Sequence, residues 1–299
     1  MSKLYIIEKG IVFSEDIDRI FDGINAFDFN YQFRPSKETI RYDRKDFRQD
    51  TCRIFRNNVT IVSEDQMMDV NNLFDRTIPV VTLDKIYIKP DEKNIFFLDC
   101  TRVSGTDEII ARKDESVDDQ ITRIANSLPS KEILLADDVV FTGRVLNTLI
   151  EKFKEKGITV VGIVAGISSW KAFIKYNKEL RLGIETNFLM AEKVKDQICE
   201  RDFYFGVAGS GIMLSKESKE KQPYFIPFGD PKTRASIPER SVRKFSIGCI
   251  ERSIRLWEDI DSQRGTETLM SELPEKIAGT NDKDPVVKTL RRTLKTINR

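Results

Sequence analysis

Histidine is absent from all 299 residues of the chain. Without it the chain cannot form a Ser-His-Asp triad, a Cys-His nucleophile pair, an HExxH zinc site or a histidine general base. Any chemistry must therefore rely on carboxylates, lysine, arginine, tyrosine, threonine, backbone amides or a hard metal ion.

The chain also lacks an excess of charge of either sign. It has 49 Lys and Arg residues and 48 Asp and Glu residues, and its net charge is +1. A chain that mainly coats nucleic acid is usually strongly basic, so nucleic acid is not an expected partner. No apolar run approaches the roughly 20 residues of a membrane span, so a membrane is not expected either. The apolar stretch at residues 4–7 is too short for a signal peptide.

Cysteine is scarce and scattered. The four cysteines, Cys52, Cys100, Cys199 and Cys249, form no CxxC pair, which argues strongly against a zinc ribbon. Scattered thiols without an export signal predict a reducing, cytoplasmic location.

The chain length suits two domains, or one domain with sizeable additions. The residue pattern divides it into an irregular N-terminal region of mixed structure at 1–78, a core at 79–214, and a C-terminal loop and helical region at 215–299. Aromatic residues alternate along 27–33, which predicts a strand packed on a core, with a base-stacking platform as the alternative. The mildly basic stretch 41–56 is interpreted as a solvated face rather than a phosphate site.

Apolar segments alternate with helical patterns through the middle region. Strands are expected at 80–89, 95–100, 133–136 and 158–163, and Ser116 predicts the N-cap of a helix. Continuous apolar strands that alternate with amphipathic helices predict an α/β fold, with an open, mostly parallel sheet covered by helices on both faces. A proline-rich loop and two amphipathic helices are expected in the C-terminal region.

The most informative segment is 133–146, which reads Ile-Leu-Leu-Ala-Asp-Asp-Val-Val-Phe-Thr-Gly-Arg-Val-Leu. It predicts a buried strand that ends in Asp137 and Asp138, followed by a tight turn at Thr142 and Gly143 and then a helix. Open α/β sheets bind ligands at this edge, and backbone N–H groups at a helix N-terminus can hold a phosphate. The two carboxylates can accept hydrogen bonds from sugar hydroxyls or face a hydrated Mg²⁺. The segment therefore offers adjacent places for a sugar and its phosphate.

This segment resembles the diphosphate-sugar signature of the type I phosphoribosyltransferases, in which four apolar residues and two acids precede a loop that ends Thr-Gly-x-Thr. The resemblance covers about 135 residues and implies Mg²⁺-dependent transfer of a phosphoribosyl group from phosphoribosyl diphosphate to a nitrogenous acceptor such as a nucleobase. It implies that Asp137 and Asp138 are the catalytic pair, which hold the ribose hydroxyls and face Mg²⁺. A homodimer is compatible with it. The ligand's 5′-phosphate would be bound by the loop residues Val139, Val140, Phe141, Thr142, Gly143, Arg144 and Val145.

Two departures from the family pattern matter. Val145 replaces the closing threonine, so one phosphate-binding hydroxyl is missing. No clear diphosphate-binding loop exists upstream, because residues 63–65 are acidic and would repel a diphosphate. Arg102, in the segment 101–105, is an alternative donor, and Lys232 and Arg234 in the proline-rich loop are candidates for closing over an anion.

These departures keep other function classes open. One is a non-catalytic regulatory module that binds phosphoribosyl diphosphate or a nucleotide without turnover, and another is an assembly protein with a vestigial site. A P-loop ATPase is excluded because the chain has no GxxxxGK[ST] motif. Residues 202–205 faintly resemble a base-contacting strand of the purine-salvage members, but an ordinary β-strand is the preferred interpretation.

Overall fold

The computed structural model describes residues 4–21, 33–73, 75, 77–88, 94–106, 108–112 and 115–299. The chain divides into two compact units. Unit 1 combines residues 1–9 with 62–194, and unit 2 combines residues 10–61 with 195–299. Each unit is thus assembled from two separate stretches, whereas the sequence pattern suggested divisions at 78 and 214. The aromatic segment 27–33 lies, apart from Phe33, outside the described residues.

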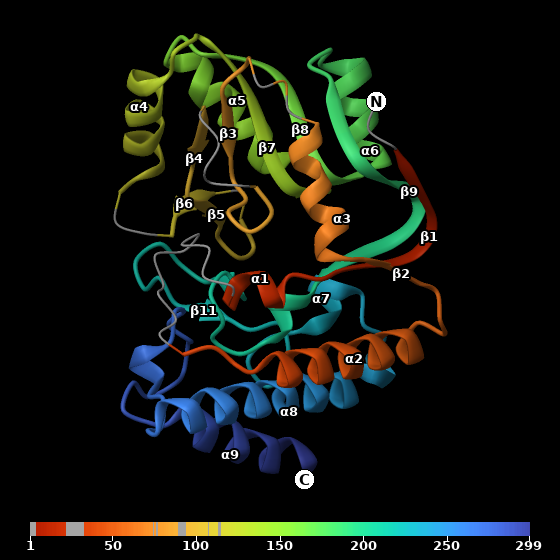
Figure 1. Cartoon of the computed structure of the whole chain (residues 1–299), viewed down its shortest axis with the longest axis vertical. Coiled ribbons are helices and arrows are strands. Elements are labelled where there is room, and N and C mark those ends of the chain that lie inside the picture. The colour runs from red at the N-terminus through yellow and green to blue at the C-terminus, as the bar shows by residue number, and fades with distance from the viewer. Residues whose placement is uncertain are drawn as a thin grey trace. The chain divides into compact units, whose positions relative to one another are not determined.

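A seven-stranded sheet has the order β2-β1-β9-β8-β7-β3-β4 (Figure 1). The strand pairs β4–β3, β3–β7, β7–β8 and β8–β9 are parallel, and the helices described below cover both faces in unit 1. This confirms the predicted α/β fold with an open, mostly parallel sheet. The strands are β1 (Tyr5–Ser14), β2 (Val59–Val62), β3 (Val80–Thr82), β4 (Ile95–Phe97), β7 (Glu132–Val140), β8 (Thr159–Ser169) and β9 (Ile184–Cys199).

Four α-helices of unit 1 are α3 (Glu64–Met68), α4 (Val117–Ser127), α5 (Arg144–Glu155) and α6 (Trp170–Ile174). Helices α4 and α5 bury Ile121 and Phe153 in one cluster with Leu135 of the sheet. The other face is approached by α3, because a Cβ atom at Gly166 would lie 2.8 Å from Cε of Met67. The predicted cap of α4 is confirmed, since the Ser116 side chain accepts a hydrogen bond from the backbone N–H three residues on.

Two predicted strands are shorter than expected. Strand β3 ends at Thr82 instead of continuing to residue 89, because Asp84 curls the chain by accepting hydrogen bonds from three backbone N–H groups. The segment 95–100 splits into β4 and the start of β5 (Cys100–Arg102), which pairs antiparallel with β6 (Ile109–Ala111). Residues 83–89 and 98–99, which were expected within strands, therefore follow the carboxyl ends of β3 and β4.

Unit 2 is mostly helical, with α1 (Ile17–Phe21), α2 (Lys37–Ile54), α7 (Pro231–Ala235), α8 (Glu239–Arg264) and α9 (Val286–Asn298). It also holds the short pair β10 (Ile212–Met213) and β11 (Lys221–Gln222). The two predicted C-terminal helices are confirmed as α8 and α9. The irregular structure expected for 1–78 is wrong for α2, an 18-residue helix that begins after Ser36, whose side chain accepts a hydrogen bond from the N–H of Thr39.

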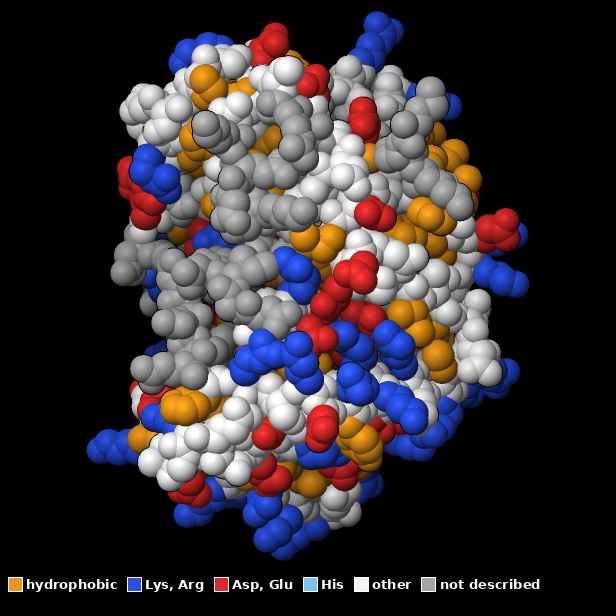
Figure 2. Space-filling model, in the orientation of Figure 1, with side chains coloured by type: hydrophobic (Ala, Val, Ile, Leu, Met, Phe, Trp, Pro, Cys, Tyr) orange, Lys and Arg blue, Asp and Glu red, His pale blue; other side chains and the backbone are white. Residues whose placement is uncertain are grey.

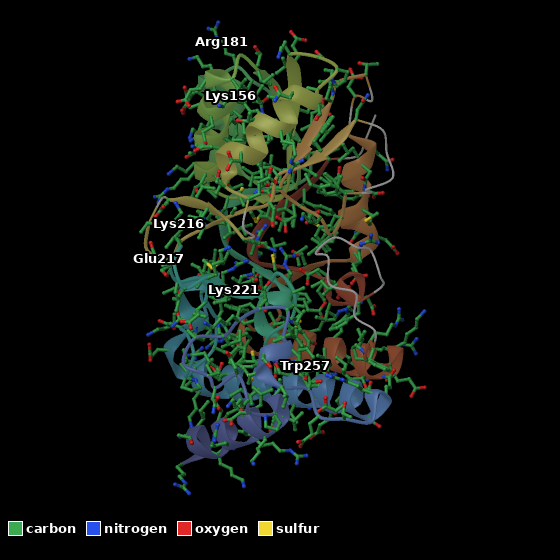
Figure 3. The ribbon with its side chains drawn as sticks, turned by 90° about the vertical axis from the view of Figure 1, so that its left-hand side faces the viewer. Lys156, Arg181, Lys216, Glu217, Lys221 and Trp257 are labelled. Atoms are coloured by element: carbon green, nitrogen blue, oxygen red, sulfur yellow. The ribbon has the colours of Figure 1, made fainter. Side chains whose placement is uncertain are left out.

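Aromatic side chains fill the core of unit 2. Phe47, Phe203 and Phe245 are buried and in mutual contact. Trp257 lies on α8 (Figure 3). Its Nε1 donates a 2.8 Å hydrogen bond to the carbonyl oxygen of Phe205. The strand expected at 202–205 is wrong, since Glu200–Phe203 forms a 3₁₀ turn that serves this core. Across the described ranges, no helix combines the length and apolarity needed to cross a membrane.

Candidate functional site

The order of strands reverses between β3 and β7. From β3 the chain moves outward to β4, then returns to pair β7 with the other side of β3 before continuing to β8 and β9. Open α/β sheets bind ligands outside the carboxyl ends of the strands at such a reversal. Asp84 follows β3, and Asp137 and Asp138 lie near the carboxyl end of β7. Three carboxylates therefore lie at the position where this topology places a ligand.

The two adjacent acids are held by the backbone around them. The N–H of Asp138 donates to Oδ1 of Asp137 at 3.0 Å, and the N–H of Val139 donates to Oδ1 of Asp138 at 2.7 Å. Burial raises the pKa of Asp137 well above its usual value, and the negative charges of Asp138 and Asp84 raise it further. A carboxyl group in this environment keeps its proton to higher pH and is able to donate as well as accept hydrogen bonds.

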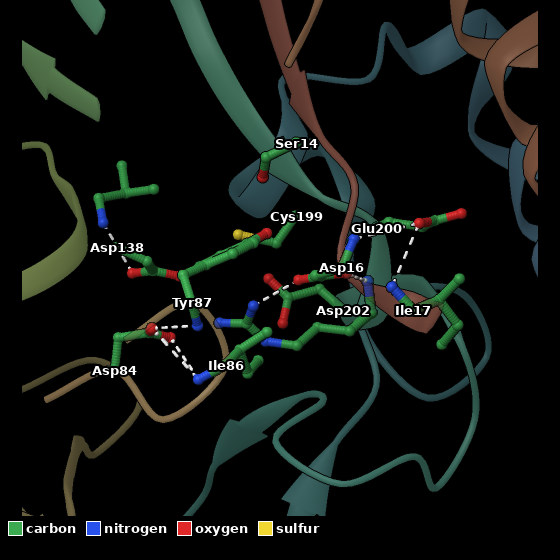
Figure 4. A network of polar contacts seen from close by, with 12 residues as sticks. Ser14, Asp16, Ile17, Asp84, Ile86, Tyr87, Asp138, Cys199, Glu200 and Asp202 are labelled. Atoms are coloured by element: carbon green, nitrogen blue, oxygen red, sulfur yellow. Dashed lines mark hydrogen bonds and ion pairs between the residues drawn. The ribbon is translucent and has the colours of Figure 1, made fainter. Parts of the chain in front are cut away.

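Asp84 is a site residue that the sequence analysis missed. The residue is 5% exposed, and its carboxylate accepts hydrogen bonds from the N–H groups of Ile86, Tyr87 and Ile88 at distances of 2.6 to 3.3 Å. Two of these contacts, those to Ile86 and Tyr87, can be followed in Figure 4. The only available signal was an acid inside the predicted strand 80–89. The structure ends β3 at Thr82 and pairs it with β7, and this places Asp84 beside Asp137.

Gly143 is the N-cap of α5 and shapes the turn that precedes this helix. Its φ is +68°, a left-handed conformation that favours glycine, and no side chain caps the helix. The hydroxyl oxygen of Tyr176 lies 2.9 Å from the carbonyl oxygen of Gly143 and 2.9 Å from Oδ1 of Asn147. Ser169 donates a further hydrogen bond to the carbonyl oxygen of Phe141. Tyr176 and Ser169 thus hold the turn in place through its carbonyl oxygens. The N–H groups at the N-terminus of α5 are suited to binding an anion.

The predicted loop is wrong for Val139 and Val140, which are the last two residues of β7 and pair with β8. The other predicted loop residues differ in exposure. Phe141, Thr142 and Arg144 are exposed, whereas Val140 is 2% exposed and belongs to the core. The side chain of Val145 is partly buried against the same core. The valine found where the family pattern has threonine thus contributes to packing, and the loop can offer a phosphate its backbone N–H groups and the hydroxyl of Thr142.

The three predicted cationic candidates lie in different places. Arg102 is exposed at the end of β5 in unit 1. Lys232 and Arg234 lie on α7 in unit 2, where Lys232 is 2.7 Å from Glu239 and Arg234 is 2.7 Å from Asp202. Their charges are therefore balanced by neighbouring acids within unit 2, a different unit from the acid pair.

Two cations that the sequence analysis did not single out are Lys85, which follows β3, and Arg112, which follows β6. Lys85 is next to Asp84 in the chain, and burial lowers the pKa of its amine while the charge of Asp99 opposes this shift. Arg112 donates a 2.8 Å hydrogen bond to Oδ1 of Asp99, which follows β4. Lys85 thus brings positive charge to the sheet edge that holds the carboxylates, whereas the charge of Arg112 is balanced by Asp99.

The described residues contain no group of three or more Cys, Asp or Glu side chains placed to hold a metal ion. Mg²⁺ usually binds through one or two carboxylates together with substrate phosphates and water. Asp137 and Asp138 offer that smaller set of oxygen donors, so they fit a Mg²⁺ ion that arrives with a diphosphate.

Neither a scan of protein-family models nor a search of curated proteins found a match to this chain. Its function is therefore inferred from the geometry and chemistry of the site.

Proposed function

We propose that unit 1 binds phosphoribosyl diphosphate at the carboxyl ends of β3 and β7, and transfers its phosphoribosyl group to a nitrogenous acceptor such as a nucleobase. The observation that carries the proposal is the succession of Asp137, Asp138 and the Thr142–Gly143 turn at the point where the strand order reverses. A sugar and its 5′-phosphate would find complementary groups side by side there.

Each part of the ligand has a counterpart in this arrangement. The turn and the first N–H groups of α5 hold the 5′-phosphate, and the carboxylates of Asp137 and Asp138 accept hydrogen bonds from the ribose hydroxyls. Lys85 supplies positive charge for the diphosphate. Bound Mg²⁺ would neutralise part of the diphosphate charge.

In the proposed reaction, the acceptor nitrogen forms a bond to the anomeric carbon while the bond from that carbon to the diphosphate oxygen breaks. The diphosphate leaves with the electron pair, and a proton lost by the acceptor passes to a base, for which Asp137 is suited by its raised pKa. The transition state resembles an oxocarbenium ion, so the negative charge of Asp138 stabilises the sugar electrostatically. We assign this activity to the cytoplasm because all four cysteines are free thiols.

One observation favours a second candidate, a regulatory module that binds the same ligand without turnover. The N–H groups of Ile86, Tyr87 and Ile88 are occupied by Asp84 and are not available to a diphosphate. Asp84 also adds a third negative charge beside Asp137, which disfavours a diphosphate there. This candidate predicts binding without release of diphosphate.

A combined binding and turnover experiment tests both candidates. The chain is incubated with phosphoribosyl diphosphate, Mg²⁺ and a panel of purine, pyrimidine and pyridine bases, and diphosphate release is measured beside calorimetric binding. Base-dependent release that falls by about 100-fold or more in Asp138→Asn supports transfer. Binding that Asp138→Asn weakens, without release, supports the regulatory module.

The matched control is Asp282→Asn, which neutralises an exposed carboxylate in unit 2. It should leave both measurements unchanged. If wild-type protein neither binds phosphoribosyl diphosphate nor releases diphosphate with any base, both candidates are wrong.

A further inference from the structure

Helix α2 sorts its charges onto two faces. Asp43, Asp46 and Asp50 form ion pairs of 2.6 to 3.2 Å with Arg252 and Arg255 of α8. The basic residues lie around the rest of the helix, at spacings of three or four residues that bring neighbours onto one face. They are Lys37, Arg41, Arg44, Lys45 and Arg48.

These five side chains and Asp18 of α1 line a pocket of about 460 Å³, entirely within unit 2. Figure 2 shows Lys and Arg side chains gathered over α2. A pocket of this volume is within the range used for small molecules, from about 300 to 1,000 Å³. The stretch interpreted from sequence as a solvated face thus contains a concave basic surface.

Buried carboxylates hold two of the arginines in place. Glu200 is fully buried and accepts a 3.2 Å hydrogen bond from Nε of Arg44, and Asp18 accepts one of 3.0 Å from its Nη1. Glu200 also accepts the N–H of Ile17 at the start of α1, as Figure 4 shows. Arg48 is paired in the same way with buried Glu15. These two guanidinium groups are therefore preorganised, which lowers the entropic cost of binding an anion.

The other three cations, Lys37, Arg41 and Lys45, are exposed, and no carboxylate of the described residues lies within ion-pair distance of them. They are spaced four residues apart, so their like charges repel one another along the helix. Five cations of the lining face three carboxylates, namely Asp18 in the lining and the Glu200 and Glu15 paired with Arg44 and Arg48, so a net positive charge remains. An anion bound here would relieve the repulsion and be attracted by preorganised charge.

We propose that this pocket binds a compact ligand with two or three linked phosphates, either an inorganic polyphosphate or the phosphate chain of a nucleotide. A terminal phosphate carries roughly 1.5 to 2 negative charges near neutral pH, and each linked phosphate adds to them, so the ligand is opposite in sign to the three exposed cations. The concave shape and the near-neutral net charge of +1 favour a small ligand over extended nucleic acid. The pocket is in unit 2 and does not depend on the site proposed in unit 1.

Calorimetric titration of the full chain at low salt with inorganic triphosphate and with ATP, both without added metal, tests this proposal. The variant Arg41→Ala/Lys45→Ala should weaken binding of both probes by about tenfold or more. The control Lys288→Ala/Lys295→Ala removes the same charge from exposed positions on α9 and should bind like wild type. All four substitutions are at exposed helix positions, where alanine is well tolerated, and circular dichroism confirms folding.

Further arms separate the alternatives. Asp137→Asn should keep triphosphate binding, which distinguishes this pocket from the site in unit 1. Absence of binding by either probe, or equal loss in the α9 control, would overturn the proposal. Binding of a single-stranded oligonucleotide that triphosphate does not displace would also overturn it, in favour of nucleic acid.

Discussion

A methyl group on Gly143 would lie 2.2 Å from the hydroxyl oxygen of Tyr176, far inside van der Waals contact. That hydroxyl also lies 2.9 Å from the carbonyl oxygen of Gly143, so the contact is a hydrogen bond as well as a steric limit. The φ of Gly143 is +68°. Glycine is therefore required at the turn both by backbone conformation and by the close approach of Tyr176.

Gly143→Ala should destabilise the fold more than Gly157→Ala does. Gly157 has a φ of +70°, and no atom lies within 4 Å of the position that a Cβ would take there. The loss of unfolding free energy in Gly157→Ala therefore measures the cost of the left-handed backbone alone, about 1–2 kcal/mol. Gly143→Ala adds the overlap with Tyr176. Urea unfolding of both variants checks this, and equal losses of stability would contradict it.

Tyr176→Phe provides a second measurement on the same turn. It removes the oxygen at 2.2 Å but leaves ring carbons at 2.8 Å from the added methyl group. In the Tyr176→Phe background, Gly143→Ala should therefore cost less free energy of unfolding than in wild type. Strictly additive effects in this double-mutant cycle would show that the two residues are not coupled as described.

Asp137→Asn should separate ligand binding from stability. The pKa of Asp137 is raised in the folded chain, so the folded state binds this proton more tightly than the unfolded state and loses stability as pH rises above the usual aspartate range. Replacing the carboxylate by an amide removes this loss, so the variant should gain stability relative to wild type from pH 4 to pH 8. Binding of phosphoribosyl diphosphate should decrease at the same time. A stability difference that does not change with pH would argue against the raised pKa.

The native chain should expose one reactive thiol. Cys100, Cys199 and Cys249 are buried, and burial raises the pKa of the thiols of Cys100 and Cys249 to about 12, whereas Cys52 is only half-buried. Since the thiolate is the reactive form, iodoacetamide at pH 7.5 should modify Cys52 first. Peptide mass spectrometry measures the order, and urea-unfolded protein, in which all four thiols react, is the control. Rapid modification of Cys100 in native protein would contradict the packing around β5.

The strand, acid pair, turn and helix of the candidate site could be predicted from sequence because their signals are local, although β7 continues through the acids to Val140, where a loop was expected. An apolar run, two acids and Thr-Gly before a helical pattern all occur within residues 133–146. The role of Asp84 could not, because it depends on the pairing of Thr82 with Ala136, residues far apart in the chain. Helix α2 was missed for a related reason. Its periodicity is mainly one of charge, and that pattern acquires meaning only when Arg252 and Arg255 of α8 pair with its acids.

Asp43 should make the stability of unit 2 depend on pH. Its side chain is buried against Arg255, one carboxylate oxygen has no hydrogen-bond partner among the described residues, and burial raises the pKa to about 6 from the usual 3.8 despite the attraction of Arg255. The folded state therefore loses stability as pH rises from about 4 to about 6, by up to about 3 kcal/mol.

Asp43→Asn isolates this effect, because other titrating groups contribute equally to both proteins. The free energy of unfolding of wild type minus that of Asp43→Asn should decrease as pH rises from 4.5 to 7, whatever the fixed cost of losing the ion pair with Arg255. Urea unfolding at five or six pH values gives the difference curve. The exposed Asp282 supplies the control, since Asp282→Asn should give a flat difference over the same range. A flat curve for Asp43→Asn would mean that Arg255 and Arg252 hold the Asp43 carboxylate ionised, so that α2 and α8 meet through a fully charged interface.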